Sequence, residues 1–376
     1  MLHSKLPHVG TTIFTTMSAL AAKHHAINLA QGFPNFPIDE QLQSCLIETA
    51  STGAHQYAPM AGLPDLREKI CSLVKKQYNR SVQPEQVLIT AGATQAIFTA
   101  IQALVHVGEQ VIVLDPSYDC YEAPIQLSGA HPVRIPLDHN FKPDWSRIAE
   151  AITPKTRMLI INNPHNPSGT IWDAQDYLAL EALMQAHPQL ILLSDEVYEY
   201  ITFEDAFKSI NEYPTICERA IIVSSFGKTF HITGWKVGYL ICSHDLMLEI
   251  HKVHQFLVFS VNSIAQHALS AYLNRVDVNL LGSFYQEKRD LFRAGLANSR
   301  FNLLPAQGSY FQVASFEEIA ALSDTQFCEE LTIKHGVAAI PLSVFNANGE
   351  DRKLIRFCYA KTTETLQAAT ERLCKI

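Results

Sequence analysis

The feature that most constrains the fold is an alternation of short apolar runs and amphipathic segments between residues 85 and 241. The apolar runs predict β-strands at residues 87–90, 110–114, 132–135, 157–161, 190–193, 220–223 and 237–241. Helical periodicity is clearest between them at residues 94–105 and 174–185. Strands and helices that alternate over this length predict an α/β fold with a mostly parallel sheet covered on both faces. Such sheets bind ligands at the carboxyl ends of their strands.

Four polar side chains follow shortly after predicted strands: Asp115, Asn166, Asp195 and Lys228. Because the carboxyl ends of parallel strands meet at one edge of a sheet, we expect these side chains to share a site. A buried amine has a lowered pKa, which makes it more nucleophilic and able to form an imine with an aldehyde. From the residues alone, Lys228 and the nearby Lys236 are equally consistent with two solvated loop lysines.

The last quarter of the chain predicts a second, smaller lobe of α+β type. A long helix at residues 280–297 should bridge the two lobes, and the N-terminal arm contributes a helix at residues 14–23. The remaining predicted strands lie at residues 309–313, 337–340 and 354–359, and the remaining helices at residues 324–334 and 364–374. We therefore predict a large domain of residues 41–277 and a small domain of residues 1–40 with 278–376.

Charge and composition argue against several functional classes. The chain has 29 basic and 37 acidic residues, a net charge of −8 and no basic cluster, so no nucleic-acid partner is expected. No apolar run approaches about 18 residues, so no membrane span is expected. The eight cysteines are scattered without a C-x-x-C pair, as in reduced cytoplasmic proteins. His251 and His254 have a metal-ligand spacing, but no carboxylate or cysteine pattern joins them, so no metal site is predicted.

Four motifs occur in one order across nearly the whole chain: Asn166-Pro167-Ser168-Gly169, Asp195-Glu196-Val197-Tyr198, Ser225-Phe226-Gly227-Lys228 and Arg356. In these motifs the chain resembles the class I/II aminotransferases, which have the pyridoxal-phosphate (PLP) fold type I. Tyr57-Ala58-Pro59 and the segment at residues 115–121 are similar to one branch of that family. The branch contains the methionine aminotransferases and the kynurenine–oxoglutarate (glutamine transaminase K) enzymes.

The resemblance implies that pyridoxal 5′-phosphate is the cofactor and that Lys228 binds its aldehyde covalently. Freed by the substrate, the same amine then moves a proton between the substrate Cα and the cofactor. Asp195 follows a buried strand, where a carboxylate is costly without a cationic partner, and the protonated pyridine nitrogen would supply one. By resemblance, Tyr198 and Asn166 donate hydrogen bonds to the cofactor O3′. The family also leads us to expect a cis peptide bond between Asn166 and Pro167.

The resemblance further implies a phosphate site. The strand-to-helix junction at residues 90–96 is suited to present the N–H groups of Ala93 and Thr94 at a helix N-terminus. Ser225 matches a position that adds a hydroxyl group. Lys236 matches a position where many relatives have arginine, so the phosphate would meet a point charge.

Three aromatic residues are assigned by resemblance to the cofactor and substrate. Tyr118 is expected to stack on the pyridine ring, although a core role is nearly as consistent with the sequence. Tyr57 is expected to reach the phosphate from the neighbouring subunit, which implies a homodimer with shared sites. Phe259 is a candidate wall of the substrate pocket. Relatives that act on kynurenine have a histidine after this phenylalanine, and Ser260 stands here, so a preference for kynurenine is not predicted.

Arg356 interrupts an apolar strand, so its side chain either points to water or binds a buried anion. The resemblance favours the anion and makes Arg356 the bidentate partner of the substrate α-carboxylate. Asn166 and the loop around Gly32 are expected to help bind the same carboxylate.

These residues predict a ping-pong transaminase that moves the amino group of methionine, or of an aromatic or related amino acid, to a 2-oxo acid. Its expected partners are these small molecules and a second copy of the chain. Cysteine-conjugate β-elimination would use the same Lys228 and Asp195, so the motifs leave that reaction open. A non-catalytic PLP-binding regulatory module is a further alternative, but it calls for a basic DNA-binding extension, and none is seen.

Overall fold

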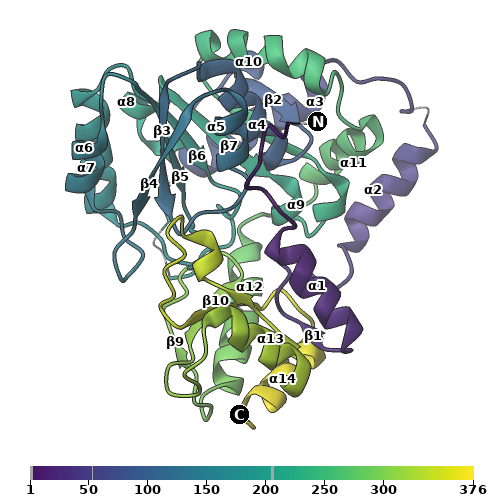
Figure 1. Ribbon diagram of the computed structural model, residues 1–376. Coiled ribbons are helices and arrows are strands. Elements are labelled where there is room, and N and C mark those ends of the chain that lie inside the picture. The colour runs from purple at the N-terminus through teal and green to yellow at the C-terminus, as the bar shows by residue number, and fades with distance from the viewer. Residues whose placement is uncertain (1–2, 53, 205–206) are drawn as a thin grey trace.

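The computed structural model describes residues 3–52, 54–204 and 207–376. Figure 1 shows an upper region built around a broad sheet and a lower region that holds the C-terminus. The helices of the lower region are α1 (Ile13–Lys23), α12 (Leu280–Gly295), α13 (Asp324–His335) and α14 (Thr363–Leu373). The exact domain boundaries at residues 41 and 278 stay a prediction.

A seven-stranded sheet of order β2-β8-β7-β6-β5-β3-β4 forms the centre of the upper region. Its strands are β2 (Val87–Thr90), β3 (Gln110–Asp115), β4 (His131–Pro136), β5 (Thr156–Asn162), β6 (Ile191–Asp195), β7 (Ala220–Ser225) and β8 (Gly238–Ile241). All neighbouring pairs from β7 to β4 are parallel, whereas β8 runs antiparallel to both β7 and β2. The predicted α/β fold with a mostly parallel sheet is confirmed.

Helices cover both faces of this sheet, and β5 shows how its sequence serves both. Met158 and Ile160 pack into a cluster with residues of α4, α5 and α10, whereas Leu159 and Ile161 pack with residues of α6, α7 and α8. At the β2 end, α2, α3 and α11 cover the sheet. The bounds are α2 (Glu40–Ala50), α3 (Pro64–Tyr78), α4 (Ala93–Leu104), α5 (Glu122–Leu127), α6 (Trp145–Ala151), α7 (Ala174–Ala186), α8 (Pro214–Cys217), α9 (Phe226–Thr229), α10 (His244–Leu257) and α11 (Ser263–Leu273).

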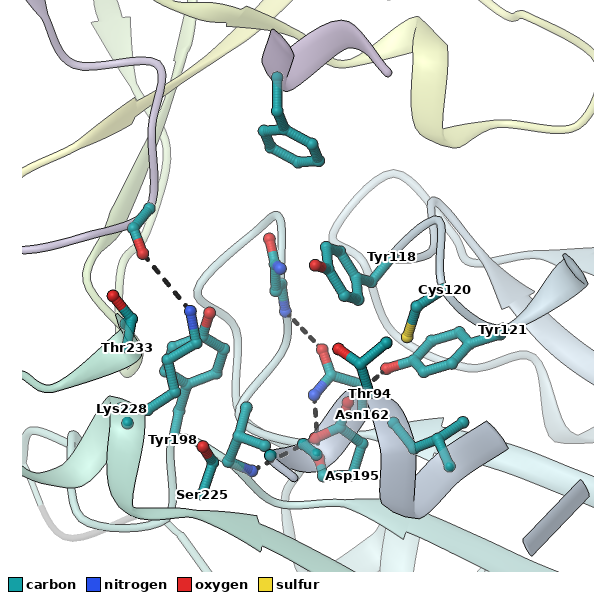
Figure 2. Close-up of a pocket in the computed structure, with 18 of the residues that line it drawn as sticks. Thr94, Tyr118, Cys120, Tyr121, Asn162, Asp195, Tyr198, Ser225, Lys228 and Thr233 are labelled. Carbon is teal, nitrogen blue, oxygen red and sulfur yellow. Dashed lines mark hydrogen bonds between the residues drawn. The ribbon is translucent and has the colours of Figure 1, made fainter. Parts of the chain in front are cut away.

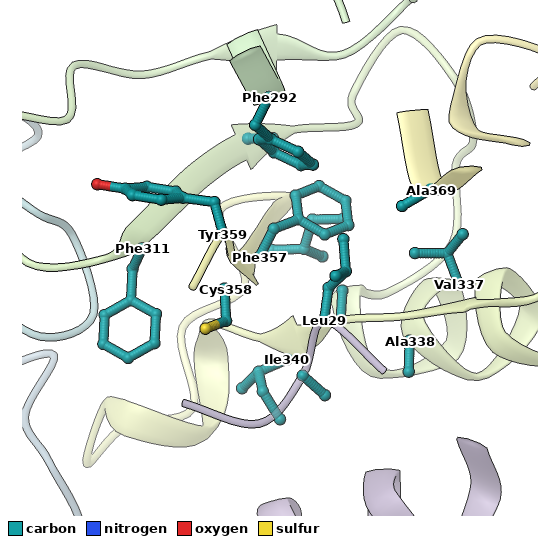
Figure 3. Packing of buried hydrophobic residues seen from close by; sticks show 14 of the residues in the cluster. Leu29, Phe292, Phe311, Val337, Ala338, Ile340, Phe357, Cys358, Tyr359 and Ala369 are labelled. Atoms are coloured by element: carbon teal, nitrogen blue, oxygen red, sulfur yellow. The ribbon is translucent and has the colours of Figure 1, made fainter. Parts of the chain in front are cut away.

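The lower region is an α+β unit around a four-stranded antiparallel sheet of order β12-β13-β10-β9. These strands are β9 (Asn302–Leu303), β10 (Phe311–Ser315), β12 (Ile340–Pro341) and β13 (Leu354–Cys358). The N-terminal arm joins this unit, because β1 (Ile27–Asn28) pairs in parallel with β11 (Val337–Ala338). Figure 3 shows Leu29 of the arm packed among Phe292, Phe357 and Ala369 in the shared core. Short 3₁₀ segments complete the chain at Pro84–Gln86, Ile210–Glu212, Thr233–Trp235 and Ser343–Phe345.

Two sequence-based expectations about the backbone are wrong. The strand predicted at residues 337–340 is two strands, because β11 pairs with the N-terminal arm and β12 pairs with β13 in a different sheet. The cis bond expected at Asn166–Pro167 is also misplaced, since the cis bonds found in the described chain are Asp115–Pro116 and Asn163–Pro164. Asn166 instead lies in a turn closed by a hydrogen bond from the Gly169 N–H to the His165 carbonyl.

None of the helices in the described ranges has the length and apolar character needed to cross a membrane. All eight cysteines are free thiols. His254 is a core residue, with its ring nitrogens 3.2 Å from the Gln95 side chain and 3.2 Å from the Met60 carbonyl. The described residues contain no cluster of three or more His, Cys, Asp or Glu side chains that could hold a metal ion.

Candidate active site

A pocket of about 260 Å³ lies at the carboxyl end of the parallel strands, between the large sheet and the lower region (Figure 2). It brings together eleven of the fourteen residues that the sequence placed in the site: Gly32, Ala93, Thr94, Tyr118, Asn166, Asp195, Tyr198, Ser225, Lys228, Lys236 and Arg356. The expectation for Asp115 is wrong, since Asp115 does not line the pocket and its carboxylate instead pairs with Arg134 and accepts a hydrogen bond from the Ala347 N–H. The sheet supplies most of them at strand ends, and β13 and the arm supply Arg356 and Gly32. One pocket therefore draws on segments from nearly the whole length of the chain.

Lys228 stands on the short helix α9, directly after β7. Its Nζ atom donates to the Tyr310 hydroxyl at 3.0 Å and to the Gly32 carbonyl at 3.4 Å. The pKa of Lys228 is lowered to about 8, chiefly by burial. Cys358 and Asp195 oppose the shift, and the nearby cations Arg356 and Lys236 contribute to it. An amine with such a pKa is partly neutral near neutral pH, which makes it usable as a nucleophile and as a base.

Asp195 ends β6 and is only 4% exposed. Its Oδ2 accepts a hydrogen bond from the Tyr121 hydroxyl at 2.7 Å, and its Oδ1 accepts one from the Val197 N–H at 3.3 Å. No ion pair in the described chain includes this carboxylate. Burial is the main cause that raises the pKa of Asp195 to about 6. The carboxylate thus faces the pocket with room for a cationic or N–H donor.

Arg356 points inward from β13 and is 1% exposed, so the alternative that it points to water is wrong. Its guanidinium donates to the Asn166 Oδ1 at 2.7 Å and to the Ala30 carbonyl at 3.2 Å. Its Nε is a buried donor for which the described residues offer no acceptor. The carbon Cζ lies 3.9 Å from the centre of the Phe311 ring. A buried guanidinium with a free donor is a ready partner for a carboxylate.

The N-terminus of α4 and Lys236 form a compact cationic corner. Gly92 precedes this helix with a φ of 77°, a conformation that favours glycine. A Cβ atom at Gly92 would lie 3.3 Å from the Lys236 Nζ, so the ammonium group sits close to the first turn. Ala93, Thr94 and Ser225 line the pocket at the same corner. Helix N–H groups, a hydroxyl and an ammonium group together suit a phosphate.

Two aromatic side chains surround the reactive groups. The Tyr198 ring lies 5.9 Å from the Lys228 Nζ and packs edge-on against Tyr310, with centroids 5.2 Å apart. Burial raises the pKa of the Tyr198 hydroxyl, so it is a protonated donor. Tyr118 lines the pocket and packs edge-on against Tyr121 at 6.3 Å.

Several residues in or beside the pocket were missed by sequence reasoning. Tyr121 holds Asp195, and Asn162 donates to the Asp195 main-chain carbonyl at 2.9 Å while accepting from the Asn166 N–H at 2.7 Å. Tyr310 lies beside Lys228. Asn162 ends β5, next to β6, so its place at a strand end was the available signal. For Tyr310, in a loop before β10, the sequence offered no such signal.

Tyr57 and Phe259 lie outside this pocket. Their side chains are 81% and 55% exposed, and their rings pack edge-on with centroids 5.3 Å apart. Within one chain they therefore contact neither Lys228 nor Asp195, and their predicted roles in a neighbouring subunit's site stay a prediction.

The chain belongs to a known enzyme family. Residues 24–373 match the family model "Aminotransferase class I and II", so the protein is a class I and II aminotransferase. The match to solved aminotransferases also identifies its fold as PLP fold type I.

Comparison with individual relatives shows which aminotransferases the chain is similar to. The chain is 47% identical to the methionine aminotransferase of Escherichia coli K12 over 98% of this chain and 97% of that protein. The solved structure of YbdL from Escherichia coli, described as having a methionine aminotransferase function, superimposes with a TM-score of 0.97 at 46% identity and full coverage of both chains. Kynurenine–oxoglutarate transaminase 1 of Mus musculus is 31% identical over 94% of this chain and 93% of that protein. The prediction of an aminotransferase is confirmed, and β-elimination or a non-catalytic regulatory role is not favoured.

Proposed function

We propose that the chain is a PLP-dependent transaminase that moves the amino group of methionine, or of an aromatic or related amino acid, to a 2-oxo acid. The observation that carries this proposal is that Lys228 and Asp195 line the same pocket. The amine has a pKa lowered to about 8, and the carboxylate is buried without a cation to pair with in the described chain. The similarity to methionine aminotransferase supports methionine as a substrate.

The residues present fit pyridoxal 5′-phosphate. Asp195 offers an unpaired buried carboxylate to the protonated pyridine nitrogen, and Tyr121 keeps that carboxylate oriented. Ala93, Thr94, Ser225 and Lys236 would hold the phosphate. When bound, the cofactor supplies an electron sink for the carbanion formed at the substrate Cα.

The remaining side chains bind the substrate and move its proton. Arg356, with its free Nε, would bind the α-carboxylate in a bidentate manner and so aim the Cα toward Lys228. Lys228 would first hold the cofactor aldehyde, and its freed amine would then take the proton from the substrate Cα. The Tyr310 hydroxyl, 3.0 Å from the Lys228 Nζ, would keep this amine in place. Tyr198 and Asn166 would donate to the cofactor O3′ and Tyr118 would cover the ring, as the resemblance implies.

We also propose a cytoplasmic homodimer with shared sites. Eight free thiols suit a reducing compartment. The exposed Tyr57 and Phe259 rings are available to a neighbouring subunit, where Tyr57 would reach the phosphate and Phe259 the substrate side chain. Mixing inactive Lys228→Ala with an inactive Tyr57→Ala variant tests the sharing. Random reassociation should restore about a quarter of the sites, whereas unshared sites would restore none.

The transamination itself is tested by a half-reaction on the purified holoenzyme. Methionine added alone should convert the visible absorbance of the bound cofactor to that of its amino form and release one equivalent of the oxo acid of methionine. Adding a second 2-oxo acid should reverse the spectrum. A protein that instead released pyruvate and ammonia from a β-leaving-group amino acid, and no oxo acid from methionine, would contradict the proposal.

A further inference from the structure

The loop at Ala30–Phe33 is unusual because side chains bind four successive main-chain carbonyl groups. Arg356 donates to the Ala30 carbonyl at 3.2 Å, and the Tyr310 hydroxyl donates to the Gly32 carbonyl at 2.7 Å. Lys361 binds the two others. Its Nζ atom lies 2.7 Å from the Phe33 carbonyl and 3.4 Å from the Gln31 carbonyl. Arg356 of the pocket, together with Tyr310 and Lys361 outside its lining, therefore holds this loop together.

Lys361 is buried although its side chain is not part of the pocket lining. The residue follows β13, is 2% exposed and does not line the pocket. None of the ion pairs formed by the described residues includes it. Its Nζ atom contacts the two carbonyl groups and the face of the Phe33 ring, 4.8 Å away. Burying a lysine costs free energy. A buried lysine whose ammonium group binds two carbonyl groups of one loop therefore indicates that the loop must be held in place.

Peptide geometry shows what Lys361 controls. The Gln31 carbonyl and the Gly32 N–H belong to the same planar peptide unit, and in a trans unit they point in opposite directions. Holding the Gln31 carbonyl toward the Lys361 ammonium group therefore directs the Gly32 N–H away from it. Gly32 lines the pocket, and its N–H has no main-chain acceptor among the described residues. A Cβ atom at this position would lie 2.9 Å from the Phe311 ring, so the close approach also needs glycine.

We propose that Lys361 is a positioning residue that orients the Gly32 N–H toward the substrate carboxylate, opposite the guanidinium of Arg356. The inference rests on the proposed function, because it takes the pocket to bind an amino-acid carboxylate. Lys361 contacts neither substrate nor cofactor in this arrangement. It acts through the Gln31–Gly32 peptide unit, and its effect is confined to ligands that carry a carboxylate.

The test compares two amines that differ only in the carboxylate. Methionine and 3-(methylthio)propylamine are each added to the holoenzyme, and the rate constant for conversion of the bound cofactor is measured as a function of concentration. In Lys361→Met the apparent dissociation constant for methionine should rise about tenfold, whereas the amine without a carboxylate should react as in the parent protein. The competitive inhibitor 4-(methylthio)butanoate should lose affinity by a similar factor.

Matched variants separate positioning from folding. Lys142 also donates to a main-chain carbonyl, that of Ile171 at 3.0 Å, and lies outside the pocket, so Lys142→Met should leave both amines unaffected. Lys361→Arg keeps a cation at the loop and should restore methionine affinity to within about threefold of the parent. If Lys361→Met does not fold, the same comparison is made with Lys361→Gln, for which the same selective loss is expected.

Two results would overturn the inference. One is an equal loss for methionine and 3-(methylthio)propylamine in the Lys361 variants, which indicates a general structural role. The other is methionine affinity unchanged within twofold. Both are distinct from failure of the proposed function, in which the parent protein itself would not convert methionine.

Discussion

The two walls of the pocket leave opposite charges uncompensated. On the sheet side, the Asp195 carboxylate accepts hydrogen bonds from Tyr121 and from the Val197 N–H. On the side of the lower region, the Arg356 guanidinium donates to the Asn166 amide and the Ala30 carbonyl, which are also neutral. Neither charge forms an ion pair within the part of the chain that the structure describes. Each wall therefore offers a buried charge to a group of opposite charge that could enter the pocket.

The difference between the walls separates two tasks. Asp195 stands at the end of a central strand, where it can set the electronic properties of a ring bound beside it. Arg356 and the carbonyl-rich loop at residues 30–33 belong to the lower region, where they can hold a substrate by its carboxylate. Changes to the Asp195 wall should act on the rate of the chemical step, and changes to the Arg356 wall on substrate affinity.

The largest effect is expected where the two walls meet, at Lys228. Lys228→Ala removes the amine that we propose as both the covalent anchor and the base, so kcat/KM for methionine should fall by a factor on the order of 10⁴ or more. The visible absorbance of the lysine-bound cofactor should also disappear. A variant that retained this absorbance would end the assignment of Lys228.

Asp195→Ala should remove the charge on the sheet side of the pocket and lower kcat selectively. Without the carboxylate, the ring nitrogen of the proposed cofactor would lose the anion that we propose keeps it protonated, so kcat should fall by a factor on the order of 10² to 10³. The KM for methionine should change much less, because Arg356 is intact. Steady-state kinetics on the cofactor-saturated variant measures the split, and a change confined to KM would contradict the division of tasks.

Arg356→Lys should weaken substrate binding on the opposite side of the pocket. The lysine keeps a positive charge but cannot bind a carboxylate in a bidentate manner, which corresponds to a loss of about 10- to 100-fold in substrate affinity. We expect this loss in KM for methionine and in the inhibition constant of 4-(methylthio)butanoate, with kcat changed by less than about fivefold. An unchanged KM would remove Arg356 from carboxylate binding.

The smallest expected effect is a shift in the pH dependence of cofactor capture by Lys228, caused by the charge of Arg356 on the opposite wall. Burial lowers the pKa of Lys228 to about 8, and the Arg356 cation contributes to the lowering. The neutral amine is the nucleophile, so capture of pyridoxal 5′-phosphate by the cofactor-free protein should accelerate as pH rises and level off above about pH 8. Arg356→Gln removes a positive charge, so the midpoint should move to higher pH. Stopped-flow rates across the pH range measure both midpoints, and an identical midpoint in the two proteins would refute the coupling.

Sequence reasoning was most successful at strand ends. Asp195 and Lys228 follow apolar runs whose period marks them as strands, so their shared edge could be predicted from the pattern. Asn162 also ends a strand, but its role, like that of Tyr121, depends on the order of the strands in the sheet. That order, with β5 beside β6, is not written in any local pattern. The division of the predicted strand at Ala339 was likewise a matter of tertiary pairing.

The sequence by itself determined the alternation that makes a mostly parallel sheet, the polar residues at its carboxyl edge and the family to which the chain belongs. These follow from local periodicity and short motifs, which act over a few residues. Only the tertiary structure decided that Arg356 faces inward and that Lys361 meets the Phe33 carbonyl, 328 positions away along the chain. Such contacts depend on how the N-terminal arm packs into the lower region, and the spacing of residues along a chain carries no record of that packing.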